Sequence, residues 1–264
     1  MSQPAASPLR LTRRGRLAVT VVVVATLVAA LALLSSLGSQ ARPDDAGVLD
    51  SADVGQPRAS GGTVAEAQAK PARSPRPTPV PERAVSQSGS GGLSVVPGRA
   101  QPDTSGRVIR YRLMLEDGLT VRGEPVDRRE IARIVHTILT DERGWQPIDG
   151  VAFQRVSGET SDVDVVLASP DTTDAMCAPL GTGGWLSCFN GYATVLNARR
   201  WFSGAESYGD DLVNYRRYLV SHEMGHYLGH QHVDCPAPGS VAPVMVQQTK
   251  SLFGCTKGPW PNGS

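Results

Sequence analysis

The stretch that decides the fold is LVNYRRYLVSHEMGHYLGHQH, residues 212–232, which holds four of the chain's five histidines within eleven residues. Asp210 or Asp211 can cap a helix that runs through Leu228. Gly229 follows, and glycine tolerates the left-handed conformation in which many helices end. The sequence therefore predicts one long helix late in the chain. The residues that recur along one face of it, three and four positions apart, are Leu212, Tyr215, Leu219, His222 and His226.

The histidines have the spacing of metal ligands. His222 and His226 lie four residues apart, so both imidazoles can bind one Zn²⁺ ion at about 2.0 to 2.1 Å. A bend at Gly229 lets the chain turn back, so that His232 can become the third ligand. A fourth position then stays open for water. Glu223, offset by one residue from the first ligand, can take a proton from that water as the general base without binding the metal.

The spacing of these residues is specific. Chance occurrence of three histidines, one glutamate and one glycine in this arrangement is on the order of one in 100,000 for a chain of this composition. The main alternative is a closed structural zinc site in which His230 is the fourth ligand. Against it, His230 is only two residues from His232 in a turning segment, and a closed site has no use for Glu223.

The pattern His222-Glu223-x-x-His226-x-x-Gly229-x-x-His232 is followed 13 residues later by Met245, within PVMV. This combination resembles the metzincin clan of zinc metalloproteases, whose long motif ends in a third histidine and precedes a methionine turn beneath the metal. The local sequence is also similar to a poorly characterised family of secreted or membrane-anchored bacterial proteins classed with these peptidases. The resemblance implies the fold, one catalytic zinc ion and hydrolysis of peptide bonds.

Two further expectations come from this resemblance. In metzincins an edge strand before the active-site helix pairs with an extended peptide substrate, and residues 192–201 occupy the matching place in this sequence. Some metzincins also carry a tyrosine two residues after the turn methionine, which supports the metal or the oxyanion. Gln247 stands at that position here, so the group that stabilises the tetrahedral intermediate besides zinc stays open.

Upstream of this motif the sequence alternates between strand and helix signals. Asp127 can cap a helix that ends near Gly144, because isoleucine, valine and leucine recur there at helical spacing. The prediction is an α+β domain with a small twisted mixed sheet and two main helices, of which the second carries the zinc motif, and an irregular C-terminal part with the methionine turn. The predicted strands are residues 107–116, 151–156, 163–168 and 192–201.

The four cysteines all lie after the first third of the chain, and their even number in an exported domain favours two disulfides. Three pairings are possible, and we expect neighbours to pair, Cys177 with Cys188 and Cys235 with Cys255. The second bridge would close a loop of about 20 residues around Met245 and add roughly 3 kcal/mol of stability.

The N-terminal third predicts a membrane anchor and a tether. Residues 1–16 are rich in arginine and expected in the cytoplasm, and residues 17–37 carry no charge over a length of about 30 Å, enough for one membrane span. A signal peptide cleaved near Ala41, which would release a secreted protein, is the alternative. Residues 38–104 contain about 27 per cent proline and glycine and no aromatic residue, which is typical of a disordered linker. The remaining residues, 105–264, form the predicted peptidase domain.

Composition and charge give no reason to expect some classes of partner. The formal charge of +1 gives no reason to expect a nucleic-acid partner, and the domain is large enough to fold as a monomer. Short acidic clusters such as Asp162 with Asp164, or Asp171 with Asp174, are usually solvated or capping residues, so no calcium site is expected. His136, far from the motif, is expected to be structural or exposed.

Together these observations predict a membrane-anchored extracytoplasmic zinc endopeptidase that acts on a peptide or protein substrate, with Glu223 as the catalytic base. The first alternative is a non-catalytic zinc module that binds peptide or cell-wall material along residues 192–201. The second keeps the zinc hydrolase but makes the substrate an amide bond of a cell-wall cross-bridge.

Overall fold

The computed structural model describes residues 77–158 and 160–264. The predicted cytoplasmic segment 1–16, the predicted membrane span 17–37 and residues 38–76 of the predicted linker lie outside the described residues. Within the described residues, no helix has both the length and the apolar character needed to cross a bilayer.

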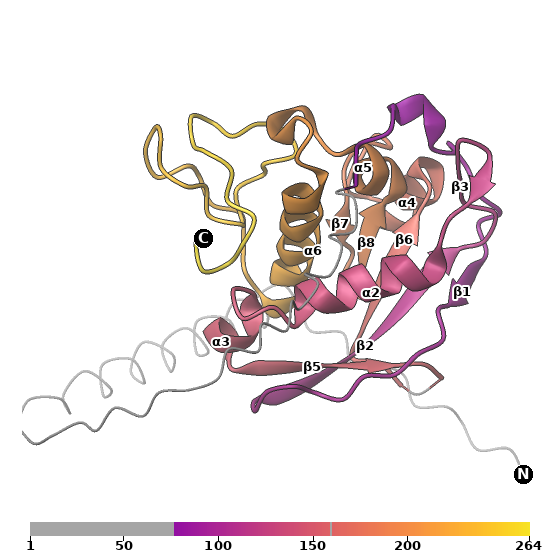
Figure 1. The fold of residues 1–264 in the computed structure, drawn as a ribbon, viewed down its shortest axis with the longest axis horizontal. Helices are drawn as coiled ribbons and strands as arrows, with labels where there is room; N and C mark the ends of the chain where they lie inside the picture. The colour runs from indigo at the N-terminus through magenta and orange to yellow at the C-terminus, as the bar shows by residue number, and fades with distance from the viewer. Residues whose placement is uncertain (1–76, 159) are drawn as a thin grey trace, which may run out of the picture. The chain divides into compact units, whose positions relative to one another are not determined.

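A mixed sheet of six strands forms the centre of the fold (Figure 1). Its strands are β1 (Leu93–Val95), β2 (Arg107–Glu116), β5 (Val151–Val156), β6 (Val163–Ala168), β7 (Cys188–Phe189) and β8 (Ala193–Asn197). On one side of β2, the strands β6 and β8 follow in parallel and β7 closes the sheet in antiparallel orientation. On the other side, β5 pairs in parallel with the first half of β2 and β1 pairs antiparallel with its end. The predicted strands 107–116, 151–156 and 163–168 are confirmed.

Two long helices pack against one face of the sheet. Helix α2 (Arg128–Leu139) begins where the side chain of Asp127 accepts hydrogen bonds from two backbone N–H groups at 3.0 Å, as predicted. It ends at Leu139 rather than near Gly144, because the chain turns there and a separate short helix, α3 (Trp145–Asp149), follows. Helix α6 (Leu212–Leu228) is capped by Asp211 and ends at Gly229. Both long helices were therefore predictable from local signals.

The opposite face of the sheet is covered by helix α4 (Pro170–Cys177), which packs on buried residues of β6 and β8. The disulfide between Cys177 and Cys188 joins the end of this helix to β7. A second disulfide joins Cys235 to Cys255 within the C-terminal part, where residues 230–264 form neither a helix nor a regular strand. Both predicted pairings are confirmed, and the fold is α+β with a mixed sheet, as expected.

The prediction of an edge strand over residues 192–201 is wrong. The strand β8 covers only Ala193–Asn197, lies between β6 and β7, and is fully buried. The Asn197 side chain then accepts a hydrogen bond from Arg199 N at 2.9 Å and starts helix α5 (Ala198–Ser203). The edge strand on this side of the described sheet is the short strand β7, which was not predicted from the sequence because two residues carry no periodicity.

The prediction that the folded domain begins at residue 105 is also wrong. The strand β1 adds to the sheet before that point, and Val85 and Val96 are buried in the main core. The carboxylate of Glu116, at the end of β2, accepts hydrogen bonds from the N–H groups of Gly89 and Gly91 at 3.1 and 3.0 Å. Residues 77–104 therefore belong to the domain, although they lack aromatic residues, because they pair with a sheet that the rest of the chain supplies.

The remaining described elements are short and connect the larger ones. They are the 3₁₀ turns η2 (Glu82–Ala84) and η3 (Glu206–Tyr208) and the hairpin strands β3 (Thr120–Val121) and β4 (Glu124–Pro125).

Candidate metal centre

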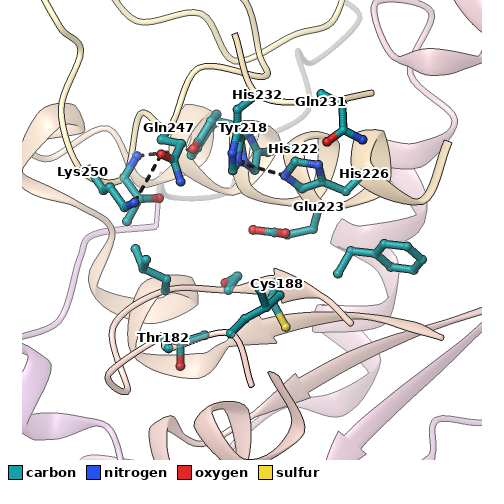
Figure 2. A pocket seen from close by; sticks show the side chains of 16 residues that line it. Thr182, Cys188, Tyr218, His222, Glu223, His226, Gln231, His232, Gln247 and Lys250 are labelled. Carbon is teal, nitrogen blue, oxygen red and sulfur yellow. Dashed lines mark hydrogen bonds between the residues drawn. The ribbon is translucent and has the colours of Figure 1, made fainter. Parts of the chain in front are cut away.

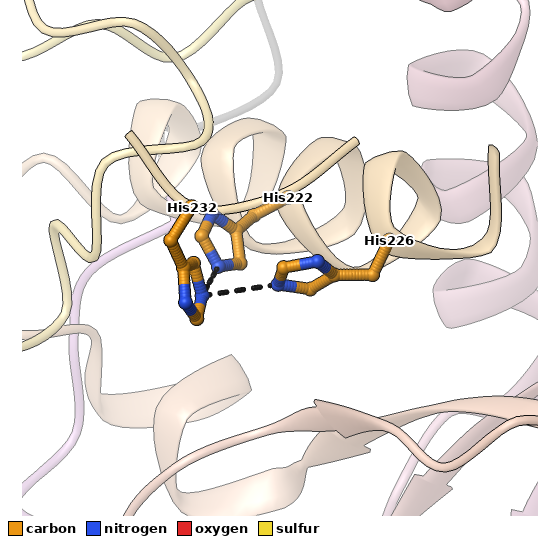
Figure 3. A group of neighbouring side chains, drawn as sticks. All are labelled: His222, His226 and His232. Carbon is orange, nitrogen blue, oxygen red and sulfur yellow. Dashed lines mark hydrogen bonds between the residues drawn. The ribbon is translucent and has the colours of Figure 1, made fainter. Parts of the chain in front are cut away.

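Three histidine side chains converge beside helix α6 (Figure 3). His222 and His226 come from adjacent turns of the helix, and His232 comes from the segment that follows it. The Nε2 atom of His232 lies 3.2 Å from Nε2 of His222 and 3.0 Å from Nε2 of His226. The three residues that the sequence predicted as ligands are thus brought together.

These distances fit a single small cation. Two nitrogens that bind one tetrahedral zinc ion at 2.0 to 2.1 Å are about 3.3 Å apart, close to the separations between the histidines. Neutral imidazole suits zinc and other transition metals, whereas calcium and magnesium prefer oxygen ligands. The donor set therefore fits the expected Zn²⁺ ion.

Hydrogen bonds to the backbone orient two of the three rings. The Nδ1–H of His222 donates to the carbonyl of Val244 at 2.8 Å, and the Nδ1–H of His226 donates to the carbonyl of His230 at 2.9 Å. We assign these tautomers from the partners, because a backbone carbonyl can only accept. The Nε2 lone pairs of both rings are consequently left for a metal ion, in the arrangement that supports histidine ligands in known metal sites.

The three histidines are neutral near pH 7. The pKa of His222 is lowered to about 3, mainly by burial and also by the neighbouring histidines, although the hydrogen bond to Val244 acts in the opposite direction. Burial is also the main reason that the pKa values of His226 and His232 lie below their ordinary value. A metal ion would therefore meet little competition from protons at neutral pH.

The return of His232 depends on the backbone at Gly229. This residue has φ 102° and ψ 1°, in the left-handed region that a residue with a side chain adopts only at a cost. Its turn is closed by a hydrogen bond of 2.9 Å from His230 N to Gly225 O. The predicted role of Gly229 as the bend of the motif agrees with this geometry.

Met245 lies buried beneath the helix, where it packs against Gly225. A Cβ atom built on Gly225 would approach the Met245 sulfur to 2.5 Å and the Trp145 ring to 2.8 Å. The backbone around Met245 supports the site as well, because the preceding carbonyl holds His222 and the Met245 carbonyl accepts a hydrogen bond from Val233 N at 3.2 Å. The methionine turn thus braces both the helix and the returning segment.

His230 points away from the cluster. Its Nε2 lies 2.9 Å from a carboxylate oxygen of Asp149, and its ring stacks on Trp145 with centroids 4.1 Å apart. The closed site that His230 would complete is therefore not formed in this structure. His230 instead ties the returning segment to helix α3.

Glu223 is buried, and its carboxylate faces the pocket below the histidines (Figure 2). In the described part of the chain this carboxylate accepts no hydrogen bond from the protein. Burial accordingly raises the pKa of Glu223 to about 8. A cation bound at the histidines would lower this pKa, because it favours the ionised carboxylate. Glu223 is thus available to exchange protons with a molecule in the pocket.

The pocket is a cavity of about 490 Å³ with two different walls. One wall carries the histidines, Glu223, Tyr218 and the turn 247–250, and the other is formed by residues 180–182 and 186–189, which run into β7. Gln247 lines the pocket, and its Oε1 accepts a hydrogen bond of 3.2 Å from Lys250 Nζ. The edge strand β7 therefore faces the histidine cluster directly.

Tyr218 and Gln248, which help to build the wall that carries the histidines, were not predicted from the sequence. Tyr218 could have been found, because it lies four residues before His222 and so on the same face of the helix. Gln248 gave no signal, yet its buried side chain fixes the turn 247–250. Its amide accepts from Tyr208 Oη and Gly258 N, and donates to the carbonyls of Pro243 and Gly258, at 2.8 to 3.2 Å.

His136 and the acidic residues discussed above as possible calcium ligands all have hydrogen-bond partners in the protein. His136 Nδ1 lies 2.8 Å from the Tyr111 hydroxyl, in agreement with the expected structural role. Each of the acidic residues that could suggest calcium is hydrogen-bonded to protein. These pairs are Asp162 with Arg110, Asp164 with Arg112, Asp171 with Ser88 and Gln87, and Asp174 with Thr182.

Comparison with known proteins gives a family but no activity. No curated protein matches the chain at a significant level. Residues 80–255, two thirds of the chain and nearly all of the described domain, match a family described as "Protein of unknown function (DUF3152)". The match begins close to the point where the described structure begins and includes the histidine cluster, the turn methionine and both disulfides. The chain belongs to the DUF3152 family.

Proposed function

We propose that this protein is a zinc-dependent endopeptidase related to the metzincins. The observation that carries the proposal is the convergence of three neutral imidazole nitrogens beside a buried carboxylate that has no hydrogen-bond partner among the described residues, in a pocket that reaches the edge strand β7. Zinc hydrolases combine three protein ligands, an open coordination position and an adjacent general base in this way. The methionine beneath the helix adds support from the resemblance in sequence.

The chemistry divides between the ion and the side chains. When bound, zinc would supply a Lewis acid that polarises the substrate carbonyl and makes water more acidic. In our proposal the carboxylate of Glu223 accepts a proton from the attacking water and delivers it to the nitrogen of the leaving amine. His222, His226 and His232 hold the ion through Nε2.

We propose Tyr218 as the donor that stabilises the oxyanion. Its hydroxyl accepts a hydrogen bond of 3.3 Å from Thr249 N, which leaves its own proton available to a ligand in the pocket. Burial raises the pKa of Tyr218 well above its usual range, so the hydroxyl stays protonated. Tyr218 would thus supply the hydroxyl that some metzincins place two residues after the turn methionine, where Gln247 stands in this chain.

Tyr218 can be tested against Tyr215, whose hydroxyl lies 3.0 Å from the Thr249 side chain and which does not line the pocket. Tyr218→Phe should lower kcat by about 10-fold or more with little change in KM, because the hydrogen bond is made in the transition state. Tyr215→Phe should keep the wild-type kcat. Equal losses in the two variants would mean that both tyrosines act only by holding Thr249.

A peptide would lie along β7 rather than β8. As one edge of the described sheet, β7 offers backbone groups to an extended chain, and Ser187, Cys188 and Phe189 line the pocket. This is the same mode of substrate binding that the sequence suggested for residues 192–201, moved by one strand. We also propose that the domain functions outside the cytoplasm, because both disulfides require an oxidising compartment.

The decisive experiment uses the purified full-length chain on a peptide library. We expect hydrolysis that a chelator abolishes and zinc restores, and one zinc ion per chain by elemental analysis. Glu223→Gln should keep the zinc and lose hydrolysis, whereas His226→Ala should lose both. Hydrolysis by a pure, zinc-loaded Glu223→Gln variant would refute the role of Glu223. A wild-type chain that binds zinc and peptide without cleaving peptides or cell-wall cross-bridges would instead be a binding module.

A further inference from the structure

The pocket contains one charged group that the proposed chemistry does not use, the ammonium of Lys250. Apart from the histidines, Lys250 is the one basic residue that lines the pocket and Glu223 is the one acidic residue, and burial favours the neutral form of Glu223. Figure 2 shows Lys250 and Gln247 at one end of the pocket, with His226 and Gln231 toward the other. The pocket is therefore electrostatically asymmetric along its length.

The backbone beneath Lys250 is fixed by buried contacts. The neighbouring Thr249 is held through its N–H by the Tyr218 hydroxyl, and Gln248, which is fully buried, anchors the turn through four hydrogen bonds. The ammonium itself donates to Gln247 Oε1 at 3.2 Å. Because the turn is already ordered before any ligand binds, ordering it would cost little of the binding free energy.

The ammonium keeps capacity for a ligand. A lysine has three N–H donors, and in the described structure Lys250 uses one of them. The opposite wall offers only uncharged side chains, among them Leu180, Leu186 and Phe189. A carboxylate entering this end of the pocket would consequently meet a cation and no competing anion other than Glu223.

We infer that Lys250 selects peptides with a carboxylate on its side of the cleaved bond. This inference rests on the proposed function, since it assumes that the pocket binds peptide. An aspartate or glutamate side chain and the free C-terminus of a peptide both supply the required carboxylate. The first source makes the protein an endopeptidase for acidic sequences, and the second directs it to residues near a C-terminus.

The test measures binding as well as hydrolysis. The ligands are fluorescent peptides with an amidated C-terminus in which one glutamate, glutamine or lysine is moved through successive positions, and a neutral peptide with a free C-terminus. Binding is measured on the full-length Glu223→Gln chain, with Lys250→Ala, Lys250→Glu or Arg129→Glu added. Arg129 is an exposed residue of α2 outside the pocket, so its variant changes the net charge equally.

At one position we expect the glutamate peptide to bind about 3- to 10-fold more tightly than the glutamine peptide, the range of a partly exposed ion pair. Lys250→Ala should abolish this difference, Lys250→Glu should reverse it in favour of lysine, and Arg129→Glu should preserve it. Added salt should reduce the preference. Tight binding of only the peptide with a free C-terminus would identify that group as the source of the carboxylate.

Two results would overturn the inference: binding that does not depend on peptide charge, or equal effects of Lys250→Glu and Arg129→Glu. Hydrolysis by the wild-type chain separates this failure from a failure of the proposed function. If peptides are cleaved without charge preference, the peptidase stands and the role of Lys250 falls. If binding depends on Lys250 but no peptide is cleaved, the role of Lys250 stands and the proposed peptidase activity falls. Thermal unfolding of each variant checks that it is folded.

Discussion

Gly225→Ala should weaken metal binding and should leave the stability of the fold unchanged or moderately lower. In the middle of a helix this change normally stabilises by about 1 kcal/mol. Here the new Cβ would lie 2.5 Å from the Met245 sulfur and 2.8 Å from the Trp145 ring, against the roughly 3.5 to 4.0 Å of ordinary contacts. Overpacking of this kind costs about 1 to 3 kcal/mol, so the net loss of stability should be about 0 to 2 kcal/mol.

The effect on zinc follows from which atoms must move. If Met245 yields, the adjacent carbonyl of Val244 shifts, and it is the partner of His222 Nδ1 at 2.8 Å. Loss of such a support typically costs 10- to 100-fold in metal affinity, roughly 1.4 to 2.7 kcal/mol. Competition with a chelator measures this affinity in the full-length chain, and denaturant unfolding of the metal-free chain measures stability.

A double-mutant cycle with Met245→Ala provides the control. Met245→Ala alone should cost about 2 to 5 kcal/mol, because it empties a buried site. Combined with Gly225→Ala it should cost less than the two single effects together, since the new methyl group enters the space that the methionine leaves. The reasoning fails if the two effects add within about 0.5 kcal/mol, or if Gly225→Ala stabilises the fold without any loss of zinc affinity.

Three further predictions test neighbouring parts of the structure. In a chelator competition, His230→Ala should keep the zinc affinity within about 10-fold of wild type, because the His230 side chain only supports the site from outside. His232→Ala should lower the zinc affinity far more, because it removes a ligand. Equal losses of affinity in the two variants would show that His230 is a ligand as well. Burial alone would raise the pKa of Glu116, but the hydrogen bonds that its carboxylate accepts outweigh burial and lower this pKa. The ionised carboxylate therefore stabilises the fold above pH 4.5, and this stabilisation is lost as the pH falls through the pKa of Glu116 in the folded state. Unfolding measured against pH should therefore show that Glu116→Gln is less stable than wild type at pH 7 and that this difference narrows in acid. Replacing Cys235 and Cys255 together by serine should lower the free energy of unfolding by about 3 kcal/mol, and an unchanged value in denaturant titration would show that the bridge contributes nothing.

Much of the fold and the histidine cluster could be predicted because the signals are local. The cap at Asp211, the glycine at 229 and the four-residue spacing of His222 and His226 involve only neighbours in sequence, and together they specify helix α6 and the direction of two ligands. The disulfide pairing of neighbours was likewise a short-range expectation. Backbone geometry over a few residues is enough to decide such features.

Other features required the tertiary structure. Nothing near His230 in sequence reveals that its ring stacks on Trp145 and meets Asp149, so its exclusion from the cluster could not be foreseen. The role of the buried Gln248 amide could not be foreseen either, because its hydrogen-bond partners lie up to 40 residues away in the chain. Polar side chains of this kind take their roles from long-range contacts rather than from spacing.

The sequence by itself determined which histidines can converge on a metal ion, where the helix that carries two of them begins and ends, and which strands form most of the sheet. Only the tertiary structure decided that β7 rather than β8 is the edge facing the histidines, that residues 77–104 belong to the domain, and that Lys250 lies in the pocket. The physical reason is that helix and strand formation follow from side-chain periodicity, whereas strand order and pocket walls depend on pairing between segments far apart in the chain.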